Sequence, residues 1–187
     1  FEAAWPVAIS PGGTLSTSNY YSSPQSIYIG TKRARNHRSM TPTYGTDSNP
    51  LVWSIQYYDN SAFNLDRQYV QLLDASPSVT QLLAMGTYNN KTAMRYYYSA
   101  RIAYSPGPGW VILNDPGAPG RSIGWHEIKA VIKSTTIDFY VDDVLAKSNV
   151  PYSSYEGKHT FDQCRIGSGF SSTSAAYYDD FSVAGGQ

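Results

Sequence analysis

The sequence predicts an all-β protein, an antiparallel β-sandwich with little or no helix. Its 187 residues include 17 Tyr, 15 Gly and 11 Pro, and only 15% are charged, a composition that favours sheets and turns over helices. Short segments of alternating apolar and polar residues recur along the chain, and clusters of Gly, Pro, Asp and Ser separate them. This spacing is typical of sandwiches, and the length suits one such unit, so residues 1–187 are expected to form a single domain.

The alternation predicts a series of short strands. In chain order they cover residues 1–9, 25–30, 51–58, 69–74, 81–87, 94–103, 110–113, 127–133, 137–142, 161–167 and 177–183. The third is the strongest, because its large apolar residues share one face: Leu51, Trp53, Ile55 and Tyr57. Residues 32–44 are polar and are expected to form a loop. Residues 79–85 are open to a second interpretation, a short helix.

The most informative stretch is residues 124–147, GWHEIKAVIKSTTIDFYVDDVLAK. Apolar residues between Ile128 and Ile132 alternate with charged ones, and the alternation resumes from Ile137 to Val141 after a Ser-Thr-Thr turn. A second turn follows at Asp142-Asp143. Half-buried strands of this kind belong to antiparallel sheets.

Charge and composition exclude several classes of function. There are 14 basic and 14 acidic residues, so the net charge is zero, and a nucleic-acid binder would be more basic. No apolar run reaches the ~18–20 residues of a membrane span. The lone Cys164 excludes an internal disulfide framework, and its shared parity with Ile166 predicts a buried thiol. A chain that begins at Phe1 and is rich in Tyr, Ser, Thr, Asn and Gly is expected to be secreted or to lie at the cell surface.

The hairpin pattern, Trp-His followed by alternating apolar residues and then Tyr-Val-Asp-Asp, resembles the concanavalin A-like, laminin-G-like jelly rolls of secreted bacterial proteins. The two ends of the chain, Phe1-Glu2 and residues 177–183, are similar to those of carbohydrate-binding modules with this fold. The resemblance implies a jelly-roll sandwich in which the first and last strands often pair.

The same resemblance implies a structural Ca²⁺, with Glu2, Asp179 and Asp180 as the candidate ligands. Calcium takes six to eight oxygen atoms, which carboxylates and carbonyls at a sheet edge can supply. The alternative is that Asp179 and Asp180 accept hydrogen bonds from turn backbones or pair with Arg165.

Catalysis has weak support in the sequence. A glucanase of this fold needs carboxylates at alternate positions, E-x-D-x-x-E, and Glu occurs only at positions 2, 127 and 156, with no such partner. The lyases of this fold use Arg, Gln, His and Tyr. The nearest equivalent here is Arg95, Tyr97, Ser99 and Arg101 on one face of one strand, with Gln56, Gln71 and His126 on neighbouring strands. The lyase motif Q-[IV]-H is absent, and His126 is expected to be a packed, hydrogen-bonded histidine.

Sugar binding has more support, because aromatic faces stack on sugars and a few planar polar groups orient them. Trp110 is expected in a loop beside a Pro-Gly turn, and Trp53 and Trp125 are expected in the core or at a corner. The basic run 32–38 is expected in a solvated loop, with contact to an acidic glycan as its alternative. The candidate ligand-binding residues are Trp110, Tyr97, Arg95, Arg101 and Tyr58.

The sequence therefore predicts a non-catalytic extracellular domain that binds a polysaccharide or glycoconjugate. One alternative is a structural subunit of an extracellular or virion assembly, because a neutral surface rich in Tyr favours self-association or contact with other domains of a larger protein. A second alternative is a polysaccharide lyase or hydrolase on the same fold.

Overall fold

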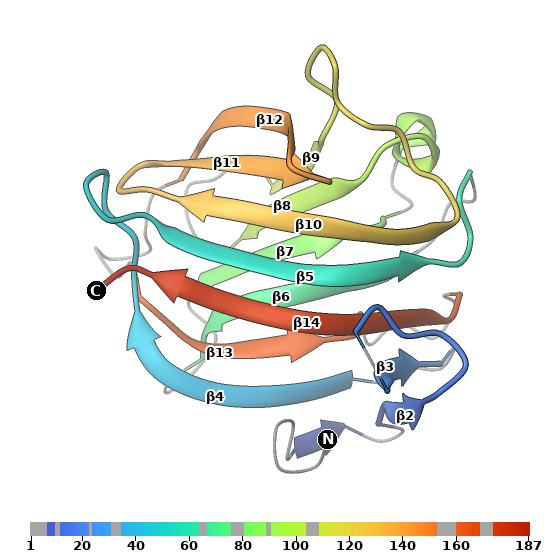
Figure 1. Ribbon diagram of the computed structural model, residues 1–187. Coiled ribbons are helices and arrows are strands. Elements are labelled where there is room, and N and C mark those ends of the chain that lie inside the picture. The colour runs from blue at the N-terminus through green and yellow to red at the C-terminus, as the bar shows by residue number, and fades with distance from the viewer. Residues whose placement is uncertain are drawn as a thin grey trace.

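Two antiparallel seven-stranded sheets pack face to face in the computed structural model (Figure 1). The structure describes residues 7–9, 12–22, 24–30, 35–63, 67–75, 81–88, 91–103, 109–152, 160–168 and 174–187. Sheet A contains, in spatial order, β1 (Val7–Ile9), β4 (Arg35–Thr43), β13 (Phe161–Ile166), β6 (Tyr69–Asp74), β7 (Gln81–Gly86), β8 (Ser99–Ala103) and β9 (Gly109–Ile112). Sheet B contains β12 (Val144–Pro151), β11 (Thr136–Val141), β10 (Gly124–Ile132), β5 (Leu51–Asp59), β14 (Ala176–Gly185), β3 (Ser26–Ile29) and β2 (Thr14–Ser16).

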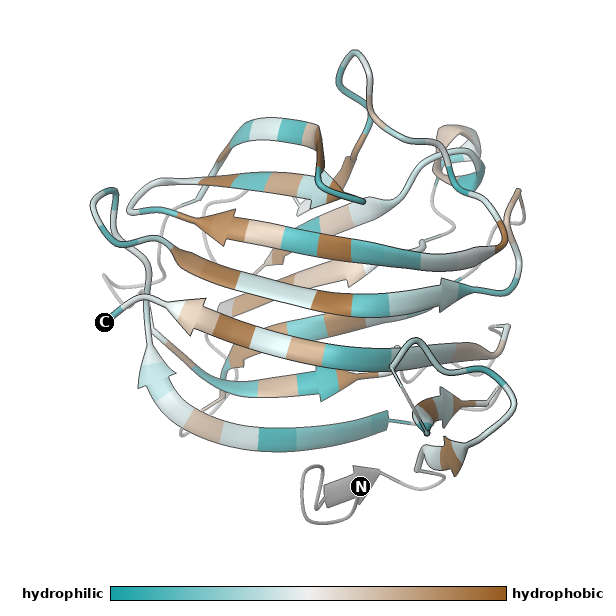
Figure 2. Ribbon diagram, viewed as in Figure 1, coloured by the Kyte–Doolittle hydropathy of each residue, from teal (hydrophilic) through white to brown (hydrophobic). Residues whose placement is uncertain are grey.

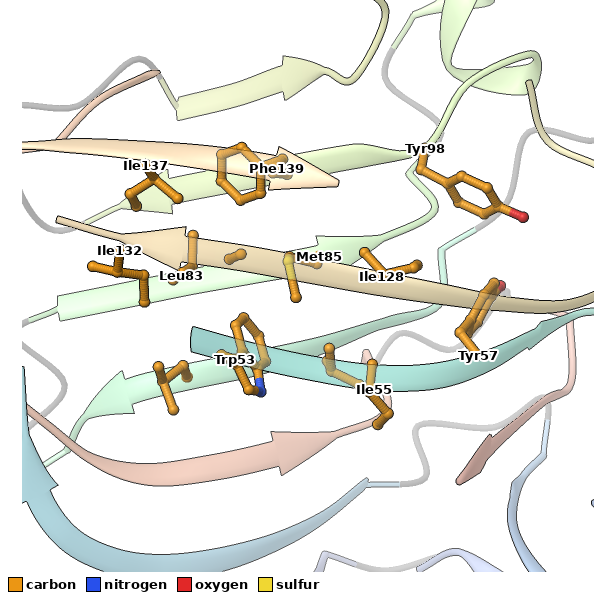
Figure 3. Packing of buried hydrophobic residues seen from close by; sticks show 14 of the residues in the cluster. Trp53, Ile55, Tyr57, Leu83, Met85, Tyr98, Ile128, Ile132, Ile137 and Phe139 are labelled. Atoms are coloured by element: carbon orange, nitrogen blue, oxygen red, sulfur yellow. The ribbon is translucent and has the colours of Figure 1, made fainter. Parts of the chain in front are cut away.

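The core lies between the sheets and follows from the alternation along each strand. On β5 the four residues predicted to share a face are all buried, and the residues between them are half-buried. Figure 2 shows the same alternation of hydrophobic and hydrophilic residues along β5 and β10. Side chains from both sheets meet in one cluster, in which Trp53 and Ile128 of sheet B lie with Leu83 and Met85 of sheet A (Figure 3).

The hairpin predicted from residues 124–147 is confirmed. Strands β10 and β11 pair in antiparallel register from Ile128 opposite Val141 to Ile132 opposite Ile137. Asp142 and Asp143 have φ angles of 51° and 61°, so both adopt the left-handed conformation of a tight hairpin turn. The Asp142 carboxylate accepts a hydrogen bond from the Glu127 backbone N–H at 2.9 Å and so holds the turn against β10.

Three expectations about local structure were wrong, and one strand prediction with an open alternative was confirmed. Residues 35–43, expected in a loop, form β4, because their backbone pairs with β1 and β13 although their side chains lack an apolar alternation. Residues 81–86 form strand β7, which confirms the strand predicted at 81–87 against the alternative of a short helix. The segment 94–103 is not one strand, because η1 (Thr92–Arg95), a 3-10 helix, precedes β8. The last strand, β14, pairs with β3 and β5, whereas the first described strand pairs with β4.

Cys164 is buried on the core side of β13, as its parity with Ile166 predicted. Burial raises the pKa of the thiol to about 12. Among the described residues, no helix has the length and apolar character needed to cross a bilayer.

A buried ion pair joins the loops at one end of the sandwich. Arg121 donates two hydrogen bonds to the Asp59 carboxylate, from Nε at 2.8 Å and from a terminal nitrogen at 3.1 Å, and both side chains are fully buried. The same guanidinium donates to the backbone oxygens of Ser61 at 3.1 Å and Met94 at 3.3 Å. It therefore ties together the end of β5, the loop after it, η1 and the segment before β10.

Removing one partner of this pair is expected to destabilise the fold strongly. In Asp59→Ala the guanidinium stays buried without its carboxylate, which costs about 3–5 kcal/mol of unfolding free energy. The double variant Asp59→Leu with Arg121→Met is expected to recover part of that loss, because it buries no unpaired charge. Urea unfolding of the wild type and the variants measures both effects. A loss below about 1 kcal/mol in Asp59→Ala would contradict the assignment.

Candidate functional site

The outer face of sheet A carries a row of side chains in register across six strands. Since Val70, Leu72 and Ile102 point into the core, the residues between them point outward. Cross-strand pairing places six such residues side by side from β4 to β9, in the order His37, Arg165, Gln71, Ala84, Arg101 and Trp110. The row runs perpendicular to the strands, which are about 4.8 Å apart.

Aromatic rings gather at the β9 end of the row. Trp110 stacks on Tyr88 with ring centroids 3.9 Å apart and planes 8° apart, and Tyr69 meets Trp110 edge-on at 5.5 Å. The Arg101 guanidinium lies 6.0 Å from the Trp110 ring, and Arg67 lies 5.4 Å from Tyr88. These contacts hold Trp110 and the two arginines in fixed positions.

Polar groups gather at the other end. Arg165 donates a hydrogen bond to the Gln163 side-chain oxygen at 3.1 Å. Burial lowers the pKa of His37, and the charges of Arg165 and Arg35 lower it further, so the imidazole is neutral at pH 7. Some buried polar atoms of this face have no hydrogen-bond partner: Arg35 Nε and His37 Nδ1 on β4, Gln71 Oε1 on β6 and Ser99 Oγ on β8. Buried polar atoms are normally satisfied, so each of these unpaired atoms lowers the stability of the fold.

The face is cationic although the whole chain is neutral. The row and its neighbours include Arg35, Arg165 and Arg101, and Asp162 on β13 accepts a hydrogen bond from the Ala75 backbone N–H at 2.8 Å. Burial raises the pKa of Tyr69 to about 12, against the opposing effect of nearby Arg101, Arg35 and Arg67. A buried phenol hydroxyl therefore lies among arginines, and the face is suited to an anionic ligand.

Comparison with known proteins supports the architecture. No protein-family model and no curated protein matches the sequence. Among solved structures, the cellulose induced protein Cip1 aligns with a TM-score of 0.64 and 13% identity over 98% of this chain and 92% of its own. Rv0315 of Mycobacterium tuberculosis, described as an immunostimulatory antigen and pseudo β-1,3-glucanase, aligns with a TM-score of 0.58 and 12% identity over 94% and 91%. This chain has the concanavalin A-like jelly-roll fold.

The same jelly roll occurs as one part of a longer enzyme. The sialidase of Trypanosoma rangeli aligns with a TM-score of 0.54 and 9% identity over 91% of this chain but only 27% of its own. Identities this low establish the fold and leave the chemistry to the residues of this chain.

The jelly roll brings together two of the predicted ligand-binding residues and separates the others. Arg101 and Trp110 are cross-strand neighbours, and Trp110 lies on β9, which confirms the strand predicted at 110–113 and not the loop position. Arg95 lies in η1 and Tyr97 follows it, so the expectation that both share a strand face with Arg101 was wrong. Tyr58 lies on the outer face of sheet B, on the opposite side of the molecule.

The proposed lyase-like constellation is also divided. His126 points into the sandwich, where Nδ1 lies 2.7 Å from the Asp142 carboxylate and Nε2 lies 3.0 Å from the Ser122 hydroxyl, so it is the packed histidine that the sequence predicted. Gln56 lies on sheet B, whereas Gln71 lies on the outer face of sheet A. His37 and Arg165 were not among the predicted site residues, because their parity with Arg35 and Gln163 is informative only once residues 35–43 are known to form a strand.

The carboxylates predicted to bind calcium have other partners. Asp179 accepts hydrogen bonds from the backbone N–H groups of Tyr21 at 2.9 Å and Ser22 at 3.1 Å, as the hydrogen-bonding alternative predicted. Asp180 accepts one from the Ser22 hydroxyl at 2.5 Å. Within the described part of the chain, no group of three or more His, Cys, Asp or Glu could hold a metal ion, and Glu2 lies outside that part. Two aspartates alone do not make a calcium site, and bound calcium stays a prediction.

The lowered pKa of His37 predicts a pH dependence of stability. As the pH falls below 6.5, the unfolded chain binds a proton at this residue before the folded chain does, so unfolding becomes more favourable. The stability contributed by neutral His37 is therefore complete above pH 6.5 and is lost as the pH falls towards the folded pKa. Urea unfolding between pH 8 and pH 5 is expected to show a shallower pH slope for His37→Asn than for the wild type, with Thr41→Ala on the same strand as control. Equal slopes in wild type and His37→Asn would contradict this assignment.

Proposed function

We propose that this protein binds an acidic polysaccharide along the outer face of sheet A. The observation that carries the proposal is the row from His37 to Trp110, in which guanidinium groups alternate with amide and aromatic side chains without a carboxylate in the described positions. Guanidinium groups pair with carboxylates and sulfates through two parallel hydrogen bonds. Aromatic rings stack on the C–H faces of sugars.

The shape of the row supports a chain ligand. It crosses six strands, so its ends are about 24 Å apart at about 4.8 Å per interval, a length that spans several sugar residues. Gln71 and Ala84 in the middle of the row are buried, so contact with a ligand falls to the half-buried residues on either side of them. Tyr88 stacks on one face of the Trp110 ring, so only the opposite face of that ring remains for stacking with another group. Arg165 and Arg101 lie on strands separated by β6 and β7, so each is placed to contact a different sugar of the chain.

The names of the structural neighbours agree with a carbohydrate ligand. Rv0315 is described as a pseudo β-1,3-glucanase, and the Trypanosoma rangeli protein is a sialidase bound to a difluorosialic acid. The acidic character of the ligand is inferred from the arginines of this chain alone.

Loss of one arginine from the row is expected to weaken binding by about tenfold or more, because each charge-assisted pair contributes about 1.5–3 kcal/mol. Affinity electrophoresis in alginate and polygalacturonate gels compares the wild type with Arg101→Ala and Arg165→Ala. The control is Lys133→Ala, which removes an equal charge from sheet B. The wild-type interaction is expected to weaken as salt is added. Migration unchanged by either polymer, or equal affinities in the three variants, would refute the proposal.

Eliminative cleavage of the bound chain is a second candidate function, favoured by the neutral His37 beside Arg35 and Arg165. In this reaction a base removes the proton at C5 of a uronate while arginines neutralise its carboxylate. The C5–H electrons form the C4–C5 double bond, the C4–O4 bond breaks, and the leaving oxygen takes up a proton. In this proposal His37 is the base, and the proton donor is the Tyr69 hydroxyl, which donates to the Ser168 carbonyl at 3.5 Å before a ligand binds.

The two functions are separated by following ultraviolet absorbance of the unsaturated product. Cleavage is expected to raise the absorbance with wild type and not with His37→Ala, while His37→Ala still binds the polymer. Binding by the wild type without any rise in absorbance refutes the lyase and retains the binding function.

A further inference from the structure

A second row of aromatic side chains crosses the outer face of sheet B, on the side of the sandwich away from the arginines. Register places Tyr28 of β3 opposite Tyr177 of β14, Tyr177 opposite Tyr58 of β5, and Tyr58 opposite Trp125 of β10. All four are half-buried, so part of each ring meets solvent. These four strands lie side by side on the near face in Figure 1.

The rings of this row hold one another at fixed angles. Tyr58 stands at 88° to Tyr177, with centroids 5.7 Å apart, and at 74° to Trp125, with centroids 5.4 Å apart. Tyr28 meets Tyr177 at 5.1 Å. Edge-to-face contacts of this kind stabilise the pairs and restrict ring rotation, so the surface is organised before any ligand arrives.

A row of polar side chains runs parallel to the aromatic row, two residues further along the strands. Asp179, Gln56 and Glu127 are cross-strand neighbours on β14, β5 and β10. A groove of about 430 Å³ lies at the β10 end of the two rows. Its lining residues are Tyr21, Gln56, Trp125, Glu127, Asp142 and Asp143.

Tyr21 forms one wall of this groove. It is 55% exposed, and its ring meets Trp125 edge-on at 6.0 Å. Its backbone N–H donates to the Asp179 carboxylate at 2.9 Å, which fixes the loop before β3 over β14. The groove therefore combines two aromatic walls with a line of carboxylate and amide groups.

We propose that this groove and the aromatic row bind a neutral polysaccharide chain. Aromatic walls bind the C–H faces of sugars, and carboxylates and amides accept hydrogen bonds from sugar hydroxyls. Lys129 pairs with Glu127 at 3.2 Å and with Asp143, and His126 Nδ1 lies 2.7 Å from Asp142, so the described lining offers no unpaired cation to a uronate or sulfate. The row spans three strand intervals, about 14 Å, which accommodates a short run of sugars.

This ligand class differs from the acidic polysaccharide proposed for sheet A, and the inference does not depend on that proposal. The two surfaces lie on opposite faces of the sandwich and share no residue. One can therefore be removed by substitution while the other is retained.

The test is affinity electrophoresis in gels that contain hydroxyethylcellulose, xyloglucan or galactomannan. At least one of these neutral polymers is expected to retard the wild type, with little change on adding salt. Trp125→Ala and Tyr21→Ala are each expected to weaken the interaction about tenfold. The matched control, Trp110→Ala, removes an aromatic ring from sheet A and is expected to leave the retardation unchanged.

Tyr21→Ala keeps the test decisive if Trp125→Ala fails to fold, because Tyr21 is exposed and lies outside the core. In the gels, any of three results would overturn the proposal: no retardation of the wild type by any of the polymers, equal retardation of wild type and Tyr21→Ala, or loss of retardation in Trp110→Ala alone. A dimer that Trp125→Ala dissociates, detected by sedimentation without sugar, would assign the surface to a second copy of the chain and also overturn it.

Discussion

The salt bridge between Arg121 and Asp59 is the contact on which the arrangement of both outer faces depends. Asp59 ends β5 directly after Tyr58, and the Arg121 backbone N–H donates to the Tyr96 carbonyl at 2.8 Å, three residues before β8 begins at Ser99. A fully buried charge is stable only when it is completely paired. The segments that pair with this guanidinium therefore have few alternative positions. It fixes the ends of strands that belong to opposite sheets.

The sandwich separates two surfaces of different chemistry. Sheet A presents arginines, a neutral histidine and a stacked Trp110–Tyr88 pair, whereas sheet B presents a tyrosine and tryptophan row beside carboxylates. Because the core fills the space between the sheets, the charged groups on one outer face do not form ion pairs with those on the other. A net charge of zero is therefore compatible with a local group of arginines on sheet A.

The fold was predictable because the alternation on β5 and in the β10–β11 hairpin is strong, and burial of Leu51, Trp53 and Ile128 enforces it. The site was predictable only in part. Arg101 and Trp110 were identified, but His37 and Arg165 depend on the pairing of β4 with β13, which no local pattern in residues 32–44 reveals. Polar strands form when their neighbours supply the backbone hydrogen bonds, and that information is non-local. The strand prediction was wrong over residues 94–98 for the opposite reason. The composition there is strand-like, but the chain forms a helical turn beside Arg121.

The reactivity of the Cys164 thiol can report how often the sandwich opens locally. The thiol is 1% exposed and its pKa is raised by burial, so it reacts with alkylating reagents only when β13 opens from the facing sheet. Since it is the single cysteine of the chain, the rate of its modification in native buffer reports one opening event at one defined place. Comparing that rate with and without polysaccharide would show whether a ligand on an outer surface makes the opening less frequent.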